Sequence, residues 1–187
     1  MSDETTKPKR KYPVYQLDKT KYLSDAEYEQ LKLILFKYSS TRPRDMLMFN
    51  LLLNTGARCQ ELLNTTTKDV YPDSKSIFIR GIKGSRNREI PLHPWLFNQL
   101  YAYMAQLPPD QKRLFPINYN RLRNIWAWYM PFNKKLHSLR HTFAIRLYEK
   151  TKDIRLVQRA LGHTHLTSTT VYQDYCYNID DFRRLIL

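Results

Sequence analysis

Three short stretches of the sequence carry side chains that could together attack a phosphate ester. They are His137-Ser138-Leu139-Arg140-His141, Leu161-Gly162-His163 and Tyr172, which follows His163 by nine residues. His137 and Arg140 are three residues apart and therefore share one face of a predicted helix. A guanidinium can clamp a phosphate, an imidazole can carry a proton, and an activated hydroxyl can act as a nucleophile. These are the parts needed to cleave a phosphodiester.

Two more cations with suitable chemistry stand upstream of these stretches. Arg58 follows an almost wholly apolar run from Met46 to Leu53, which predicts a buried helix ended by the turn Asn54-Thr55-Gly56. Lys83 lies between the predicted strands 76–80 and 87–92, at the tip of a basic β-hairpin. A lysine at such a tip either protects a sheet edge from aggregation or is carried to a phosphate.

The other elements that must position these residues are predicted to be helical. Ser24 and Glu27 form a capping box at the start of the first helix, and Thr41-Arg42-Pro43-Arg44-Asp45 breaks the chain after it. Trp126 and Trp128 are expected in the core or in helix packing. Further helices are expected at about residues 57–63, 94–106, 119–130, 137–149 and 154–161, and around Tyr172. With the hairpin, this pattern predicts an α+β fold, mainly helical with a small antiparallel β-sheet.

The sequence of 187 residues is strongly basic, with 31 Lys and Arg against 17 Asp and Glu and a net charge of +14. Such a charge predicts a polyanionic partner, either nucleic acid or an acidic membrane surface. No apolar run reaches the roughly 18 residues of a membrane span, and the N-terminus lacks the apolar region of a signal peptide. Cys59 and Cys176 form neither a disulfide framework nor a zinc pattern. We therefore expect a cytoplasmic protein with no membrane partner.

The two ends of the chain are expected to differ from the domain between them. Residues 1–20 are polar and contain Lys7-Pro8-Lys9-Arg10-Lys11, which predicts a flexible basic arm. Residues 21–187 are expected to form one domain. Its last segment, about residues 177–187, is rich in apolar side chains that need a surface to pack against. These side chains are Phe182, Leu185, Ile186 and Leu187.

Four separated segments of the chain resemble the tyrosine recombinase (phage integrase) family. They are Thr55-Gly56-Ala57-Arg58-x-x-Glu61-Leu62, the hairpin from Lys83 to Leu92, His137-Ser138-Leu139-Arg140-His141-Thr142-Phe143-Ala144, and Leu161-Gly162-His163 with Tyr172. Each piece alone is weakly specific, and their order and spacing along the chain carry the resemblance. The resemblance covers about residues 20 to 180 and implies the fold of that family's catalytic domain.

The resemblance also implies a function and a set of catalytic residues. The enzyme would be a site-specific recombinase that cleaves and rejoins DNA through a 3′-phosphotyrosine intermediate, for integration, excision or inversion. Two arginines would clamp the phosphate, the lysine would protonate the leaving 5′-oxygen, one histidine would act as base, the other would bond the phosphate, and the tyrosine would attack. These residues are Arg58, Arg140, Lys83, His137, His163 and Tyr172. Glu61 would orient Arg58 or a neighbouring histidine.

By the same resemblance the partners are double-stranded DNA at a specific site, three further protomers in a homo-tetramer, and accessory DNA-bending proteins. Residues 177–187 would then dock onto a neighbouring protomer, or else fold onto their own core. No cofactor or metal is expected. Most members of the family carry a separate DNA-binding domain before the catalytic one, whereas here about 20 residues precede it. In this respect the chain is similar to the small fimbrial-switch invertases of the family.

Several alternatives stay open at the level of sequence. Tyr175 and Tyr177 are hydroxyls near the candidate nucleophile. His137 and His141, four residues apart, could bind zinc, although the glutamate of the H-E-x-x-H motif is absent. His141 and His165 are expected to be structural or to contact DNA. The whole chain could also be a type IB topoisomerase, or a catalytically silent DNA-binding regulator on the same fold.

Overall fold

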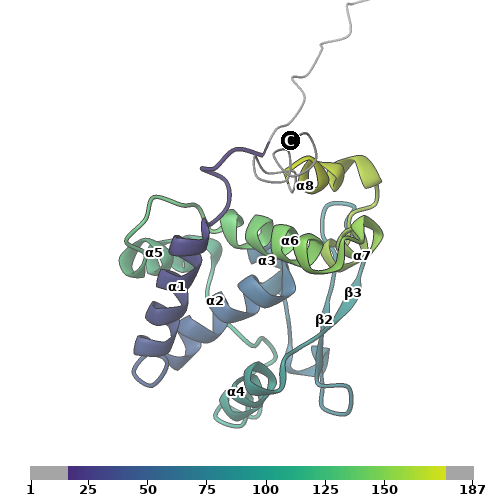
Figure 1. The fold of residues 1–187 in the computed structure, drawn as a ribbon. Helices are drawn as coiled ribbons and strands as arrows, with labels where there is room; N and C mark the ends of the chain where they lie inside the picture. Colours follow the sequence, from purple (N-terminus) through teal and green to yellow (C-terminus); the bar gives the residue numbers. More distant parts are fainter. Residues whose placement is uncertain (1–16, 176–187) are drawn as a thin grey trace, which may run out of the picture.

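The buried helix α2 (Pro43–Thr55) lies at the centre of the fold. The computed structural model describes residues 17–175, and Figure 1 shows helices on several sides of α2 and a small sheet at one edge. α2 packs against α1 (Asp25–Tyr38), α4 (Pro94–Met104) and α6 (His137–Thr151). Because it is surrounded, nearly all of its side chains are buried, which explains its almost wholly apolar sequence. The other helices are α3 (Cys59–Leu63), α5 (Tyr119–Tyr129), α7 (Ile154–Leu161) and α8 (Thr170–Tyr175), with 3-10 turns at Thr67–Asp69 and Leu166–Ser168.

The sheet is antiparallel, in the order β1 (Val70–Tyr71), β2 (Ser76–Ile79) and β3 (Arg88–Pro91). The predicted hairpin is confirmed as β2 and β3, with Ile77 opposite Ile90 and Ile79 opposite Arg88. The short strand β1 was not predicted. Side chains alternate along β3, so that Arg88 and Ile90 are buried while Glu89 is exposed. The inward face of β3 therefore carries a charged side chain into the protein.

The local signals for helix ends are mostly confirmed. Ser24 and Glu27 form the expected capping box, with Ser24 N donating to Glu27 Oε2 at 2.8 Å. Asp153 caps α7, and Gly56 and Gly162 end α2 and α7 in the left-handed conformation. One boundary was wrong, because Pro43 does not break the chain but begins α2. Proline is suited to the first position of a helix, where its missing N–H has no partner to lose.

The prediction that Trp126 and Trp128 lie in the core or in helix packing is confirmed for Trp126 and wrong for Trp128. Trp126 is buried, and it packs edge-to-face on Phe49 with ring centroids 5.2 Å apart. Trp128 is 84% exposed. Two residues along a helix turn the side chain by about 200°, so both rings cannot face the core. Helix geometry therefore places one of the two rings at an exposed position.

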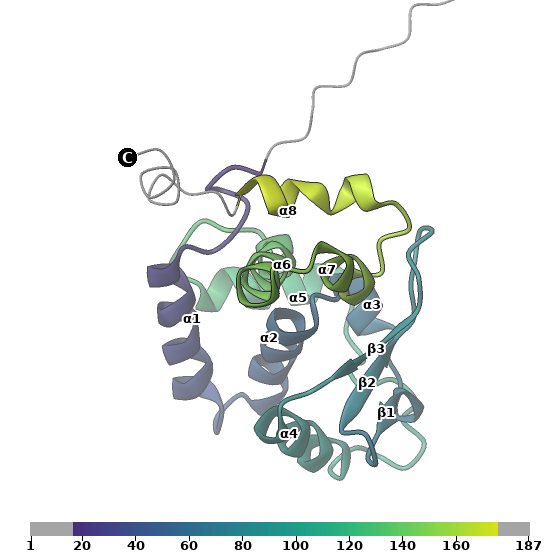
Figure 2. The ribbon, with the colours of Figure 1, turned by 45° about the vertical axis from the view of Figure 1, so that its right-hand side comes forward.

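A second apolar cluster holds α8 on the rest of the protein. Figure 2 shows α8 lying across α6 and α7, with the segment before α1 beside it. The cluster buries Tyr172 of α8 against residues of α6 and α7 and against Tyr22 of that segment. Its buried members are Tyr22, Ala144, Ile145, Tyr148, Val157, Leu161 and Tyr172. The position of Tyr172 is thus set by packing as well as by the polar contacts described below.

Two predictions concern parts of the chain that the structure does not describe. Residues 177–187, and all but residues 17–20 of the predicted basic arm, lie outside the described residues. The structure therefore leaves both as predictions. Within residues 17–175, no helix is both long and apolar enough to cross a membrane.

Candidate active site

Five of the six residues predicted to be catalytic line one cavity of about 470 Å³. They come from segments far apart in the sequence, at the start of α3, along α6, after α7 and on α8. The lining residues are Arg58, His137, Arg140, His141, His163, Thr167, Ser168, Val171 and Tyr172. The sixth predicted residue, Lys83, lies on the exposed loop between β2 and β3 and is not part of this lining.

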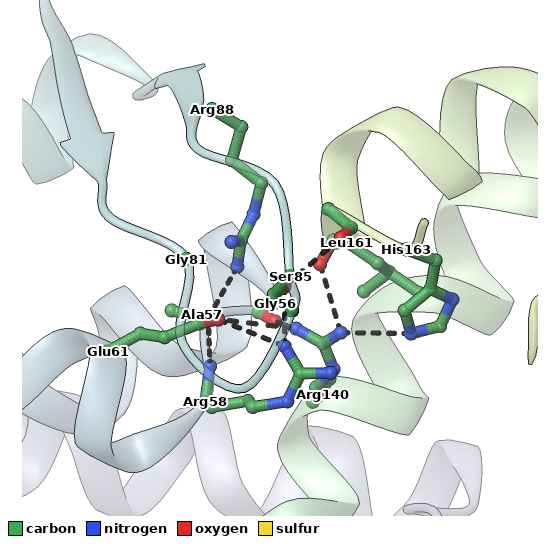
Figure 3. Close-up of polar contacts among 12 residues, drawn as sticks. Gly56, Ala57, Arg58, Glu61, Gly81, Ser85, Arg88, Arg140, Leu161 and His163 are labelled. Carbon is green, nitrogen blue, oxygen red and sulfur yellow. Dashed lines mark hydrogen bonds and ion pairs between the residues drawn. The ribbon is translucent and has the colours of Figure 1, made fainter. Parts of the chain in front are cut away.

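Arg140 is held mainly by backbone carbonyl groups. Its side chain is 3% exposed, and Nη1 donates to the Gly56 carbonyl at 2.6 Å while Nη2 donates to the Leu161 carbonyl at 3.0 Å. Both carbonyls lie where a helix ends, and helix C-termini carry partial negative charge. Figure 3 shows the guanidinium between these two ends. Burial, followed by the charge of Arg58, lowers the pKa of Arg140 to about 9, so the group stays charged at neutral pH.

His163 contacts Arg140 through one ring nitrogen and Thr169 through the other. Arg140 Nη2 lies 3.0 Å from His163 Nε2, and Thr169 Oγ1 lies 2.9 Å from Nδ1. A guanidinium can only donate, so Nε2 accepts and Nδ1 carries the proton that it donates to Thr169. Burial, with the charges of Arg140 and Arg58, lowers the pKa of His163 to about 4. The imidazole is therefore neutral at physiological pH.

The low pKa values of the buried histidines predict a loss of stability in acid. His163 and His141 have pKa values of about 4 and about 3, against 6.5 for an unperturbed histidine. Below pH 6.5 the unfolded chain takes up protons that the folded chain does not, so the free energy of unfolding falls as pH falls from 6.5 toward 4. We expect a loss on the order of 5 kcal/mol over this window, about half of it from each histidine. Urea titrations at several pH values measure it, and His163→Gln should flatten the slope. A slope that is the same in His163→Gln as in wild type would contradict the lowered pKa assigned to His163.

Glu61 joins three arginines beneath the cavity. Its carboxylate is fully buried and accepts from Arg58 Nη1 at 2.9 Å and from Arg88 Nη2 at 2.8 Å, while Arg140 Nη1 lies 3.9 Å away. Burial opposes ionisation of this carboxyl, but the hydrogen bond and charge of Arg88 outweigh burial, and the pKa is lowered. One negative charge thus faces three positive ones (Figure 3). The excess of positive charge makes the cavity a suitable place for an anion.

The structure adds Arg88 and Ser85 to the site residues predicted from the sequence. Arg88 donates to the Ala160 carbonyl through Nε at 2.7 Å, in addition to its ion pair with Glu61. Ser85 Oγ accepts from Arg58 Nη1 at 2.7 Å and donates to the Gly162 carbonyl at 3.0 Å. A charged residue at an inward position of an alternating strand is a signal that could have identified Arg88. Ser85 carries no such signal.

The β2–β3 loop that bears Lys83 is fastened to the end of α7. Arg86 N donates to the Gly162 carbonyl at 2.9 Å, and Thr164 Oγ1 donates to the Gly84 carbonyl. The contact is so close that a Cβ on Gly162 would lie 2.6 Å from the Arg86 carbonyl oxygen. Glycine is therefore required at 162 both for its left-handed backbone and for this approach. Lys83 itself remains exposed at the tip of the loop.

Tyr172 presents its hydroxyl to a histidine of α6. It is 2% exposed, and its Oη lies 2.9 Å from His141 Nδ1. His141 in turn contacts His137 edge-to-face, with ring centroids 4.7 Å apart. His137 is exposed and begins α6. Among residues 17–175, no group of three or more His, Cys, Asp or Glu side chains is arranged to hold a metal ion.

Comparison with known proteins gives a consistent set of relatives. The model of the phage integrase family matches residues 21–178. Tyrosine recombinase XerA of Thermococcus kodakarensis is 33% identical over 156 residues, which are 77% of this chain and 55% of that protein. Tyrosine recombinase XerC of Yersinia pestis is 30% identical over 143 residues, which are 69% of this chain and 47% of that protein. The chain thus spans about half the length of these relatives.

Solved structures share the same fold. The XerH site-specific recombinase, bound to palindromic difH substrate in a post-cleavage complex, superposes with a TM-score of 0.71 at 26% identity, covering 89% of this chain and 53% of that one. The catalytic domain of bacteriophage HP1 integrase gives a TM-score of 0.62 at 25% identity, with 88% of this chain and 94% of that one covered. The predicted α+β fold class, mainly helical with a small antiparallel sheet, is confirmed.

Proposed function

Because the chain belongs to the phage integrase family of tyrosine recombinases, we propose that it is a site-specific DNA recombinase that cleaves and rejoins strands through a 3′-phosphotyrosine intermediate. One observation carries the proposal. Arg58, Arg140 and Tyr172 line a single cavity together with His137 and His163, in a setting of excess positive charge. A phosphodiester is the anion that these groups could both bind and attack.

The two arginines supply the phosphate clamp. Arg58 is 30% exposed and Arg140 is 3% exposed, so one guanidinium faces the solvent and the other lies deeper. Planar guanidinium groups bind two phosphate oxygens at once and stabilise the charge that develops in the transition state. Glu61 and the two helix ends hold both groups before DNA arrives. In this scheme Glu61 positions the clamp and does not touch the reacting atoms.

Covalent cleavage then needs one proton removed and one supplied. As the Tyr172 oxygen bonds to phosphorus, the bond from phosphorus to the 5′-oxygen breaks, and that oxygen leaves as a hydroxyl with a proton from Lys83. The loop that carries Lys83 is fastened through Ser85 and Arg86 to the end of α7, near His163. His163 contacts Arg140 and would bond the phosphate by exchanging that partner. His137 is the base that the family resemblance assigns.

The same proposal extends to partners. The net charge of +14 suits double-stranded DNA, and the XerH structure contains its DNA substrate. We propose a homo-tetramer on two paired DNA sites, with accessory DNA-bending proteins, in the cytoplasm at the nucleoid. Exchange of strands in pairs would yield integration, excision or inversion. No cofactor is required, since the phosphotyrosine bond conserves the energy for rejoining.

A covalent trapping experiment tests this function. A library of nicked duplexes with a randomised core is incubated with the protein, so that cleavage next to the nick releases a short fragment and blocks rejoining. We expect a complex that survives denaturing electrophoresis, is destroyed by protease and retains a label placed on the 5′ side of the break. Sequencing of the trapped DNA then gives the preferred site.

The rival functions predict other results. A silent DNA-binding regulator would shift the selected duplexes on a native gel without a covalent complex. A type IB topoisomerase would form the complex but relax supercoiled plasmid as a monomer, with no product joined between two sites. Joined products from two selected sites, and their absence with one site, would support the recombinase.

A further inference from the structure

His141 lies beside the proposed nucleophile, although the family resemblance gives it no catalytic role. Its Nδ1 is 2.9 Å from the Tyr172 hydroxyl, and this hydrogen bond joins α6 to the candidate nucleophile on α8. The two residues are 31 positions apart in the sequence, so the contact exists only in the folded protein. Both residues also line the cavity that would receive the phosphate.

The direction of this hydrogen bond depends on which nitrogen of the His141 ring carries the proton. Burial is the largest cause that lowers the pKa of His141 to about 3, followed by the neighbouring His137 ring and the charge of Arg140. The ring is therefore neutral near pH 7 and has one acceptor nitrogen. A tyrosine hydroxyl has an ordinary pKa of about 10 and is protonated at the same pH. In the tautomer that carries its proton on Nε2, Nδ1 accepts from the Tyr172 O–H, and the proposal below uses this tautomer.

Packing makes the position of the hydroxyl definite. The Tyr172 ring is 2% exposed within the apolar cluster of α6, α7 and Tyr22. The His141 ring is 7% exposed and packs edge-to-face on the His137 ring, with ring centroids 4.7 Å apart. Neither ring can swing without disturbing these neighbours. The Tyr172 oxygen is thus hydrogen-bonded to the His141 imidazole, and Tyr172 lies in the wall of the cavity.

We propose that His141 positions the Tyr172 hydroxyl for attack and accepts its proton as the phosphotyrosine bond forms. The inference rests on the proposed function and reassigns the proton acceptor from His137 to His141. The Tyr172 oxygen bonds to phosphorus, its proton passes to His141 Nδ1, and the 5′-oxygen leaves with a proton from Lys83. A phosphodiester bound by Arg58 and Arg140 offsets part of the positive field at His141, which makes the imidazole more basic when it is needed. His137, which is exposed, then contacts the phosphate.

Two forms of the trapped duplex separate proton removal from proton supply. One carries the ordinary scissile phosphate, and the other has sulfur in place of the bridging 5′-oxygen. Sulfur leaves as a thiolate without a proton, because a thiol is far more acidic than an alcohol. Lys83→Ala should therefore cleave the oxygen substrate slowly and recover on the sulfur substrate. A defect in activating the nucleophile should be equal on both.

We expect His141→Ala to slow single-turnover formation of the covalent complex by about 10²–10³-fold on both substrates, the size typical of a lost general base. His141→Asn places an amide oxygen near the position of Nδ1, which can hold the hydroxyl but cannot take the proton. The rate of complex formation by His141→Asn should lie between those of wild type and His141→Ala. If thermal unfolding shows that His141→Ala is not folded, the rate of His141→Asn alone tests the proposal. His137→Ala, one helical turn earlier, is the matched variant and should weaken DNA binding more than His141→Asn does.

Two results would contradict the proposed role of His141. Cleavage by His141→Ala and His141→Asn at or above the wild-type rate would show that the contact only holds Tyr172 at rest, and it would overturn the proposal. Recovery of His141→Ala on the sulfur substrate would do the same, because it would place His141 on the leaving-group side. Failure of the wild-type protein to form any complex would instead count against the recombinase function itself.

Discussion

Tyr172→Phe is expected to abolish the covalent complex with DNA. The substitution removes one oxygen, which is the proposed nucleophile, and keeps the ring that fills the apolar cluster of α8. With no alternative covalent route, the loss should exceed about 10⁴-fold and leave no detectable complex. DNA binding should persist, because the arginines and Glu61 do not depend on this hydroxyl. The measurement is the trapping experiment on the selected duplex, with a native gel shift for binding.

Two companion variants make the assignment of the nucleophile specific. Tyr175→Phe changes the other tyrosine of α8 in the same way and should still form the complex at the wild-type rate. Mass spectrometry of the trapped wild-type protein should place the nucleotide on the peptide containing Tyr172. A complex that survives Tyr172→Phe and disappears in Tyr175→Phe would refute the assignment. If neither variant forms the complex, the substitutions have disrupted α8, and thermal unfolding would reveal this.

Glu61→Ala is expected to cost about 3–5 kcal/mol in the free energy of unfolding, because it leaves buried positive charges without their counter-ion. The carboxylate is fully buried and touches Arg58 and Arg88 within 2.9 Å, with Arg140 at 3.9 Å. The low pKa of Glu61 means that this charge is present at neutral pH. Urea unfolding measures the change. Glu29→Gln is the matched control, since it breaks an exposed ion pair with Lys32 and should alter stability little.

A double-mutant cycle with Arg88 tests the charge argument directly. Arg88→Met alone should destabilise, since it removes a partner of Glu61. In a Glu61→Gln background the same change should stabilise, because it reduces repulsion among the three guanidinium groups. The reversal of sign is the expected signature. An equal cost of Arg88→Met in both backgrounds would mean that packing, and not charge, explains the effect of Glu61→Ala.

The residues that the sequence reveals are those set in recognisable local patterns. Arg58 follows a glycine turn, Arg140 stands three residues after His137, and Tyr172 follows His163 at a fixed interval. The helix ends are also set by local patterns, because the capping box at Ser24 and the left-handed glycines depend on a few neighbouring residues. Their helices and the hairpin were accordingly predicted close to where they lie.

Other contacts of the site join residues that lie far apart in the sequence. Arg88 meets Glu61 from 27 positions away, Ser85 meets the Gly162 carbonyl from 77, and His141 meets Tyr172 from 31. No local window contains both members of such a pair. Composition is also silent here, because an arginine in a basic sequence looks like surface charge until its burial is known.

The way Arg140 is held has a consequence for how the site can change over time. Two of its three hydrogen-bond partners, the carbonyls of Gly56 and Leu161, are peptide oxygens and not side chains. A peptide oxygen is supplied by every amino acid and never gains or loses a proton in the range of living cells. Substitutions at the exposed positions of α7 therefore leave the anchors of this guanidinium in place, provided that the two helices still end where they do. The position of the guanidinium thus depends on where α2 and α7 end.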